Sequence, residues 1–189
     1  MKLARPFWLW AAGLVGVMAA AAALLRWQGR LWACACGYVL AWSGDAWGSD
    51  NSQHLSDPYT LTHVLHGFAL CGLLAWAAPR LAVRWRLLAA VAAEAAWEVI
   101  ENSDFVIRRY REATLALGYT GDTVINSLGD IIACGLGFLL ALRLGLWRTL
   151  AAFAATEILL LVWIRDGLLL NVLMLLFPLE SVKQWQMGQ

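Results

Sequence analysis

Long runs of apolar residues are the feature that most limits how this chain can fold. Residues 7–25 form an apolar run of about 19 residues, and about 20 such residues cross the hydrocarbon core of a bilayer as a helix. Further runs lie at 61–78, 85–101, 122–142 and 150–178. Apolar residues make up 61% of the chain and charged ones 14%, against roughly 45–50% and 25% in soluble domains. We therefore predict an all-α, polytopic transmembrane bundle of about five spans.

The loops between these runs divide the chain without breaking it into separate domains. We predict one integral membrane domain over residues 1–189, with polar outer loops at 26–60 and 102–121, the first of them structured. A signal peptide competes for the first run because Lys2 and Arg5 precede it. A retained span is favoured, since the run is long for a signal sequence and no clear cleavage site follows. The last run is about 30 residues long, which indicates a tilted helix, or a span followed by a shorter helix beginning near Gly167.

Charge in the short loops predicts the orientation. With the N-terminus in the cytoplasm, seven basic residues lie inside and five outside, which is the bias that bacterial membrane proteins show. The inner set is Lys2, Arg5, Arg80, Arg84, Arg86, Arg143 and Arg148, and the outer set is Arg26, Arg30, Arg108, Arg109 and Arg111. A net charge of +1 gives no basic surface for nucleic acid. Membrane lipids are the expected partners.

Ionisable residues gather toward the outer ends of three predicted spans. His63 and His66 open the second span, Glu98 and Glu101 close the third, and Asp122 opens the fourth, followed by Asn126 and Asp130. Residues three or four apart share one face of a helix, so each set forms a stripe, and Glu94 extends the stripe of the third span. A charge in mid-membrane costs about 2.5–3.5 kcal/mol on insertion scales, and such groups are functional candidates by default.

Structural roles compete with function for several of these residues. Asp122 could cap the helix that it opens, and Asn126 and Asp130 could join helices by hydrogen bonds. Arginines 108, 109 and 111 could simply contact anionic headgroups. Two histidines and at least four acids on three helices exceed what such roles require, so we favour a functional site.

Two chemistries suit such a site. In the first, a divalent metal, zinc or manganese, is held by His63, His66, Glu98 and Asp122, because imidazoles and carboxylates are ligands of these ions. In the second, carboxylates with different pKa values act as acid and base without a metal. The candidate catalytic residues are Glu98, Glu101, Asp122 and Asp130, and the candidate substrate-binding residues are Arg108, Arg109, Arg111, Asn126 and His54. The arginines would clamp a phosphate.

The four cysteines divide into two kinds. Cys71 and Cys134 lie in apolar runs and are expected to be small core residues. Cys34 and Cys36 are separated by one residue, which we take as too tight for an easy disulfide and which lacks the spacing of common metal motifs. A structural or interfacial role is favoured, with a bridge to a partner or a thiol function as the alternatives.

Several motifs resemble those of a known family. They are Ser52-Gln53-His54, Asp57-x-Tyr59-Thr60, His63-x-x-His66-Gly67, Trp97-Glu98-x-x-Glu101-Asn102 and Tyr119-x-Gly121-Asp122-Thr123-x-x-Asn126-Ser127. From about Trp32 onward, the chain resembles an uncharacterised family of bacterial inner-membrane proteins, which is distantly similar to VanZ-like proteins. The resemblance implies a location in the bacterial plasma membrane and brings no established reaction. The VanZ-like proteins are linked to glycopeptide resistance, which hints at envelope lipids or peptidoglycan precursors.

The leading hypothesis is a metal-dependent hydrolase that acts on a phosphate-bearing envelope lipid at the periplasmic face. The non-enzymatic alternative is a subunit or assembly factor of a larger membrane complex. A proton or solute pathway ranks lowest, because few polar residues continue to the inner side. A protease like the lipoprotein signal peptidases is also less favoured, since Asn126 and Asp130 are one residue too far apart for that motif. Whether the chain is an enzyme at all is left open.

Overall fold

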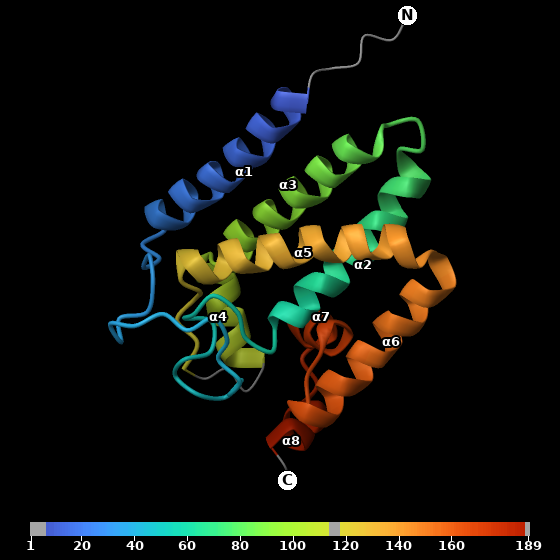
Figure 1. Cartoon of the computed structure of the whole chain (residues 1–189). Coiled ribbons are helices and arrows are strands. Elements are labelled where there is room, and N and C mark those ends of the chain that lie inside the picture. The colour runs from blue at the N-terminus through green and yellow to red at the C-terminus, as the bar shows by residue number, and fades with distance from the viewer. Residues whose placement is uncertain (1–6, 114–117, 188–189) are drawn as a thin grey trace, which may run out of the picture.

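The chain folds as an assembly of helices. The computed structural model describes residues 7–113 and 118–187, and in this part of the chain there are eight helices and no strand (Figure 1). The helices are α1 (Phe7–Trp27), α2 (Thr60–Ala77), α3 (Val83–Glu101), α4 (Asp104–Ala113), α5 (Val124–Leu144), α6 (Leu146–Trp163), α7 (Leu168–Leu176) and α8 (Glu180–Met187). The prediction of an all-α fold is confirmed. Lys2 and Arg5, which contribute to the predicted orientation, lie outside the described residues, as do four residues of the predicted loop 102–121.

Four of these helices are long and apolar enough to cross a membrane, namely α1, α2, α5 and α6. They indicate a membrane protein. The predicted third span corresponds to α3, which has 19 residues but is interrupted by charge at Arg84, Arg86, Glu94, Glu98 and Glu101. It does not qualify as a span by length and composition. By length and composition the described residues therefore contain four candidate spans, one fewer than the predicted number of about five.

The predicted last span, 150–178, is not one helix. Helix α6 ends at Trp163 and α7 begins at Leu168. Between them Arg165 has a φ of +52°, a left-handed conformation that cannot continue a right-handed helix. The alternative of a span followed by a shorter helix near Gly167 describes the structure.

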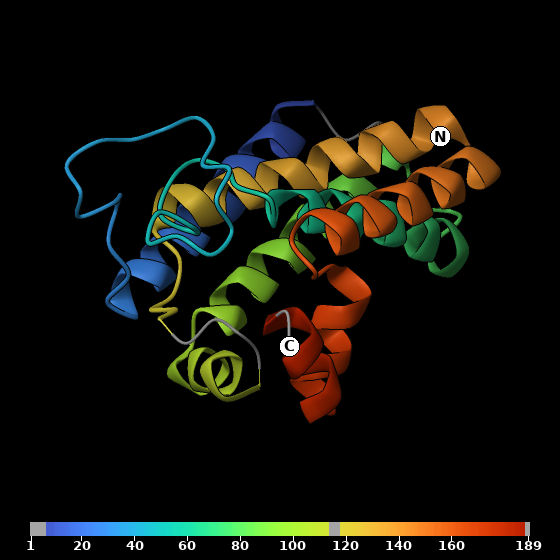
Figure 2. The same cartoon turned by 90° about the horizontal axis from the view of Figure 1, so that it is seen from below.

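Helix α5 lies at the centre of the bundle and packs most closely against α2. Glycines on both helices allow this approach: a β carbon on Gly67 would lie 2.1 Å from the carbonyl oxygen of Cys134, and one on Gly137 would lie 2.3 Å from that of Val64. Helix α3 contacts α5, α2 and α1 (Figures 1 and 2). Small residues at helix crossings let backbones approach closely in membrane proteins, and here the two glycines allow the backbones of α2 and α5 to come into contact.

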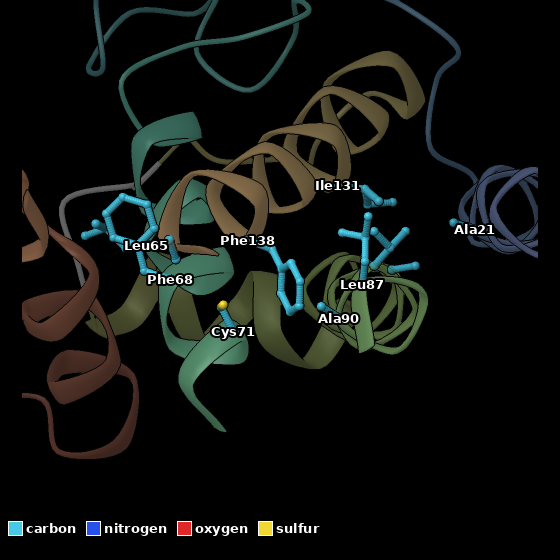
Figure 3. Close-up of a cluster of buried hydrophobic side chains, with 11 residues drawn as sticks. Ala21, Leu65, Phe68, Cys71, Leu87, Ala90, Ile131 and Phe138 are labelled. Atoms are coloured by element: carbon cyan, nitrogen blue, oxygen red, sulfur yellow. The ribbon is translucent and has the colours of Figure 1, made fainter. Parts of the chain in front are cut away.

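The apolar core joins α1, α2, α3 and α5. Figure 3 shows the ring of Phe138, from α5, between Cys71 of α2 and Ala90 of α3. Leu65 and Ile131 are fully buried in the same cluster. In contrast, α1 and α6 bury few residues and expose large apolar side chains such as Trp8 and Val162. A long apolar outer surface of this kind fits a lipid environment.

The segment 28–59 is an ordered loop without helix or strand, docked on the beginning of α5 (Figure 2). The amide of Val124 donates to the carbonyl of Leu31 at 2.8 Å, and the amide of Ile125 donates to that of Trp32 at 3.1 Å. These bonds satisfy amides that a helix leaves unpaired in its first turn. The N-cap is Thr123, whose hydroxyl accepts from the amide of Asn126, so the structure rules out the alternative in which Asp122 caps this helix.

Candidate functional site

The polar residues of α2, α3 and α5 meet at one end of the bundle, where α2 and α5 begin and α3 ends. A cavity of about 610 Å³ opens there, with further walls from the loop 28–59, from α7 and from the segment that precedes α5. The predicted site residues that line it are His63, His66, Glu101, Asp122, Asn126 and Asp130. The structure therefore brings together side chains from three helices that the sequence places far apart. Glu98 is not among the lining residues, but its Oε1 lies 3.3 Å from His63 Nδ1.

Two histidines and two glutamates converge at the base of the cavity. His63 Nδ1 lies 2.6 Å from Glu94 Oε1 and 3.3 Å from Glu98 Oε1. His66 Nδ1 lies 2.9 Å from the same Glu94 oxygen. The i,i+3 spacing in α2 directs both rings to one side, and the i,i+4 spacing in α3 presents both carboxylates to them. Glu94 was part of the predicted stripe, but the sequence did not mark it as the acid that both histidines share.

Several carboxylate oxygens at this point are buried without a hydrogen-bond partner in the described part of the chain. They are both oxygens of Glu98, Oε2 of Glu101 and Oδ1 of Asp130. Glu98 is 0% exposed and Asp130 is 4% exposed. Asp130 Oδ2 lies 3.8 Å from His63 Nε2, and Glu101 Oε1 accepts from the hydroxyl of Tyr110 at 2.7 Å. Burying an anion costs free energy unless the anion is paired. These carboxylate oxygens therefore need a hydrogen-bond donor or a cation, and the described part of the chain supplies no donor.

Asp122 lines the cavity but is held by neutral donors. It exchanges two hydrogen bonds of 2.7 Å with Asn102, one through its own amide and one through Oδ2. Its Oδ1 accepts from the hydroxyl of Tyr119 at 2.8 Å. Burial is the main reason that the pKa of Asp122 is raised, and these hydrogen bonds oppose the rise. In the described residues Asp122 belongs to no ligand group, whereas Glu98 shares one with His63, so we leave Asp122 out of the ligand set proposed below.

Asp57 lines the cavity and accepts hydrogen bonds from the loop, from the turn before α2 and from α5. Its oxygens accept from the amides of Ser52 and Tyr59 at 2.9 and 2.8 Å and from the side-chain amide of Asn126 at 3.4 Å. Burial raises the pKa of Asp57, and the backbone hydrogen bonds oppose this. Asn126 therefore fixes the loop to α5 while it lines the cavity. Asp57 was named from the sequence only within the motif Asp57-x-Tyr59-Thr60 and was given no role in the site.

The predicted phosphate-binding arginines lie beside the cavity and do not line it. Arg109 Nε donates to the carbonyl of Leu175 in α7 at 2.8 Å, and Arg111 Nε donates to that of Tyr119. Arg108 and Arg111 line a second, smaller cavity of about 240 Å³ together with Arg30. The two cavities share Thr120 in their walls. The binding roles of these arginines stay predictions.

His54 is turned into the loop and not toward the cavity. It is 1% exposed, its Nδ1 accepts from the amide of Leu40 at 3.2 Å, and its ring stacks on Tyr38. Its predicted part in substrate binding stays a prediction. One of its ring nitrogens lies within 4.8 Å of the sulfurs of Cys34 and Cys36.

Cys34 and Cys36 form a disulfide, with their α carbons 5.1 Å apart. The expectation that this spacing is too tight for a bridge is wrong. The chain turns at this point, where Gly37 has a φ of +85° and its amide donates to the carbonyl of Cys34 at 3.4 Å, and the turn brings the α carbons within the usual range for disulfides. Cys71 and Cys134 are free and buried, as expected.

Three groups of side chains in the described residues have the proximity that a metal ion requires. His63, His66 and Glu94 form the first, and His63, Glu98 and Glu101 form the second. The third combines Cys34 and Cys36 with His54, but sulfurs joined in a disulfide are not thiolate ligands. The first two groups share His63 and lie at the base of the cavity, and their imidazole and carboxylate donors suit zinc or manganese.

Comparison with known proteins places the chain in a family. A family described as "Protein of unknown function (DUF2585)" matches residues 25–188. The chain belongs to the DUF2585 family. A protein of Paracoccus denitrificans, called a UPF0314 protein, is 50% identical over 177 residues, which cover 94% of this chain and 91% of the relative. A UPF0314 protein of Sphingopyxis alaskensis is 45% identical over 186 residues, with coverage of 98% and 97%. No solved structure matches the chain.

The DUF2585 match includes the whole polar end of the molecule. It begins at Leu25, near the end of α1, and so contains the loop 28–59, both histidines and all the clustered acids. The predicted resemblance to an uncharacterised family is confirmed.

Proposed function

We propose that this DUF2585 protein is an integral inner-membrane protein that binds one divalent cation, zinc or manganese, and hydrolyses a phosphate-bearing envelope lipid at the periplasmic face. The proposal is carried by one observation, the convergence of His63, His66, Glu94 and Glu98 at the base of a cavity. Two imidazoles with carboxylates, and one side open to a cavity, is a common arrangement of catalytic metal sites.

The contacts of both histidines with Glu94 are hydrogen bonds, and the lack of a donor for Glu98 supports a bound cation over a purely structural cluster. The Nδ1 atoms of both histidines and the Oε1 atoms of both glutamates point to one place, over separations of 2.6 to 3.3 Å. A neutral imidazole has one proton, so it cannot donate to two carboxylates from one nitrogen. Glu98 consequently has no hydrogen-bond donor in the described residues. A cation at the point of convergence would satisfy both acids at once.

The balance of charge favours a cation too. Four acids surround this point, Glu94, Glu98, Glu101 and Asp130, and two histidines face them. With all four acids ionised and both imidazoles protonated, four negative charges less two positive charges leave two negative charges buried. A divalent ion compensates for that excess, and buried charges are stable only when compensated in such a way.

The remaining residues have roles that follow from their positions. A bound divalent ion supplies Lewis acidity and lowers the pKa of a water molecule. Glu101 and Asp130 line the cavity and have an oxygen without a hydrogen-bond partner in the described chain, so we propose that they accept protons during hydrolysis. Asp122 orients the cavity wall through Asn102.

The cavity walls suit an amphiphilic substrate. Leu168, Val172 and Leu175 of α7 contribute apolar side chains to the cavity wall, and we propose that they contact a lipid chain. Arg108, with Arg30 and Arg111 in the adjoining cavity, is proposed to hold a phosphate group, for which guanidinium groups are well suited. A disulfide in the loop fits an oxidising compartment such as the periplasm, and with the loop outside, the N-terminus lies in the cytoplasm.

Metal analysis of the purified full chain tests the core of this proposal. We expect about one zinc or manganese ion per chain in the wild type, and almost none in the His63→Ala/His66→Ala double variant, since two ligands are lost. Glu112→Gln removes an exposed acid of α4 and should leave the metal content unchanged. Wild-type protein without stoichiometric metal would remove the metal-dependent function.

Hydrolysis is tested separately. Proteoliposomes that contain phosphatidic acid or an isoprenyl diphosphate should release inorganic phosphate in the presence of the ion, and Glu101→Gln should reduce the rate by about 10²-fold or more, the usual effect of losing a general base. Release by the wild type at the rate of empty liposomes, over a panel of such lipids, would contradict the hydrolase.

The exposed apolar faces of α1 and α6 favour a second candidate, a non-enzymatic subunit or assembly factor of a larger membrane complex. Such faces fit lipid but also fit the helices of a partner. Purification in mild detergent distinguishes the two functions. A stoichiometric membrane partner, retained by Glu101→Gln and without phosphate release by the wild type, would favour the subunit.

A further inference from the structure

The disulfide between Cys34 and Cys36 lies at the rim of the cavity, where both cysteines contribute to its walls. Cys36 is exposed and Cys34 is half-buried. We propose that this pair is a redox site that exchanges its disulfide with the thiols of a partner protein. The inference goes beyond the proposed hydrolase and does not depend on a metal.

The bridge contributes little to holding the loop together. The stabilisation that a disulfide gives by constraining the unfolded chain grows with the length of the loop it closes, and here the sequence separation is 2. The loop is already fixed to α5 by bonds such as the 3.0 Å contact from the amide of Thr123 to the carbonyl of Ser52. A bridge that is accessible and adds little stability is of the kind that takes part in exchange.

The two sulfurs have different surroundings. The amide of Cys36 donates to Cys34 Sγ at 3.1 Å, and an N–H group directed at a sulfur stabilises the thiolate. Cys36 Sγ instead lies 3.4 Å from the carbonyl oxygen of Tyr38, which disfavours a negative charge. Cys36 is therefore the accessible sulfur that an incoming thiolate attacks, and Cys34 is the better leaving group.

His54 adds to this asymmetry from behind the pair. One of its ring nitrogens lies within 4.8 Å of both sulfurs, and imidazole beside a cysteine favours the thiolate. Its Nδ1 accepts from the amide of Leu40, so the ring proton is on Nε2. That nitrogen is buried without a hydrogen-bond partner in the described residues, and the acid nearest to it is Asp50, at 3.5 Å. A ring fixed in this tautomer is a poor metal ligand through Nε2 and a suitable neighbour for a developing thiolate.

The exchange proceeds in two steps. A thiolate of the partner attacks Cys36 Sγ, the bond between the two sulfurs breaks, and Cys34 leaves as a thiolate that takes a proton from solvent. A second thiol of the partner then loses its proton and attacks the mixed disulfide, which releases Cys36. The partner is oxidised to a disulfide, and the pair is reduced by two electrons to two thiols. The reverse sequence would restore the bridge.

Glutathione is a suitable probe, with the full chain in nanodiscs. The bridge should be reduced and re-formed reversibly as the ratio of reduced to oxidised glutathione changes, while the protein stays folded. When reduced glutathione opens the bridge and the released thiol is alkylated at once, the mixed disulfide should be found at Cys36 at least about tenfold more often than at Cys34, because access limits such reactions. The buried Cys71 and Cys134 are internal controls and should not react in the folded protein.

A His54→Gln variant tests the contribution of the ring. The rate at which glutathione reduces the bridge should fall by about fivefold or more, because the Cys34 thiolate loses a stabilising neighbour. The metal content at His63 and His66 should not change, so that failure of this inference and failure of the proposed hydrolase are distinguishable. A bridge that glutathione reduces only on unfolding would overturn the inference, as would equal amounts of mixed disulfide at Cys34 and Cys36. Tight binding of one zinc ion to the reduced pair that stops exchange would instead identify a metal site.

Discussion

Gly67 of α2 lies directly against the backbone of Cys134 in α5: a β carbon on Gly67 would come 2.1 Å from the Cys134 carbonyl oxygen. Because backbone atoms cannot move aside as a flexible side chain can, Gly67→Ala must push α2 away from α5. We expect it to destabilise the protein by about 1–3 kcal/mol or more, the usual range for overpacking, measured as a lower midpoint of thermal unfolding in detergent.

Gly72 provides the matched control in the same helix. No atom lies within 4 Å of a β carbon at that position, so Gly72→Ala should be neutral or stabilising within about 1 kcal/mol, as the change from glycine to alanine is in helices. Equal unfolding midpoints for the two variants would contradict the close approach. Because His66 precedes Gly67 in α2, the same helix crossing also fixes the position of His63 and His66 relative to α5.

The carboxylate of Glu98 accepts no hydrogen bond in the described residues, although His63 Nδ1 lies 3.3 Å away, and this predicts opposite effects of its loss with and without metal. In the presence of EDTA, Glu98→Gln should raise the free energy of unfolding by at least about 1 kcal/mol, because a buried carboxyl group that accepts no hydrogen bond is removed from a cluster of acids. When zinc is added, the wild type should gain more stability than the variant, since the stabilisation by a ligand of the native state grows with the logarithm of its affinity.

Thermal unfolding of both proteins, with EDTA and with zinc, checks this prediction. Glu112→Gln, which removes an exposed acid of α4, should follow the wild type under both conditions. A Glu98→Gln variant that is less stable than the wild type in EDTA would show that the carboxylate already has a stabilising partner.

Composition and helix periodicity predicted most of the fold, because both depend on local sequence. The apolar runs became α1, α2, α5 and α6, and the stripe from Glu94 to Glu101 became one face of α3. The break of the last run was less evident, since apolar residues lie on both sides of it. Only Arg165 and Asp166 marked the turn there, and the positive φ of Arg165 has no reliable signature in sequence.

The site was predictable as a set of residues but not as a set of contacts. Spacing placed His63 and His66 on one face, yet nothing local shows that both contact Glu94, 31 and 28 residues away. The loop 28–59 was less predictable still. Its docking rests on bonds such as that from the Val124 amide to the Leu31 carbonyl, and backbone bonds between distant segments leave no pattern in side chains.

Asp166 predicts a pH dependence of stability. Its Oδ2 accepts from the hydroxyl of Tyr59 at 3.0 Å and its Oδ1 from the amide of Gly167 at 2.9 Å. Burial is the main cause that raises the pKa of Asp166 from 3.8 to about 6. A folded-state pKa above the unfolded value means that the native state binds more protons, so the stabilisation is complete at low pH and is lost as the pH rises through 6.

Asp166→Asn keeps the shape and a hydrogen-bond acceptor but cannot ionise. Its stability relative to the wild type should therefore increase between about pH 4 and pH 7 and then level off. Urea or thermal unfolding of both proteins across this range measures the difference, in which contributions of other buried acids such as Asp57 cancel. A difference that is constant with pH would contradict the raised pKa.

Glu157 lies in the apolar helix α6 and caps the beginning of α7 with its carboxylate. Its Oε1 accepts from the amide of Leu168 at 2.8 Å and its Oε2 from that of Leu169 at 3.2 Å, so it satisfies two amides of the first turn of α7. In an apolar setting no water replaces such an acceptor. Glu157→Ala should cost about 0.5–2 kcal/mol, as the loss of a helix cap does, whereas Glu157→Gln keeps one acceptor oxygen and should cost less.

Amide hydrogen exchange shows where that cost falls. In Glu157→Ala, exchange should accelerate at residues 168–171, the first turn of α7, and remain unchanged in α2 and α5. Glu180→Ala removes an exposed acid from the first turn of α8 and should leave α7 protected. Because Leu168, Val172 and Leu175 line the cavity, fraying of α7 should also weaken the binding of any lipid there, without loss of metal at His63 and His66. Unchanged protection of α7 in Glu157→Ala would show that the packing of α7 against α4 holds this helix without the cap.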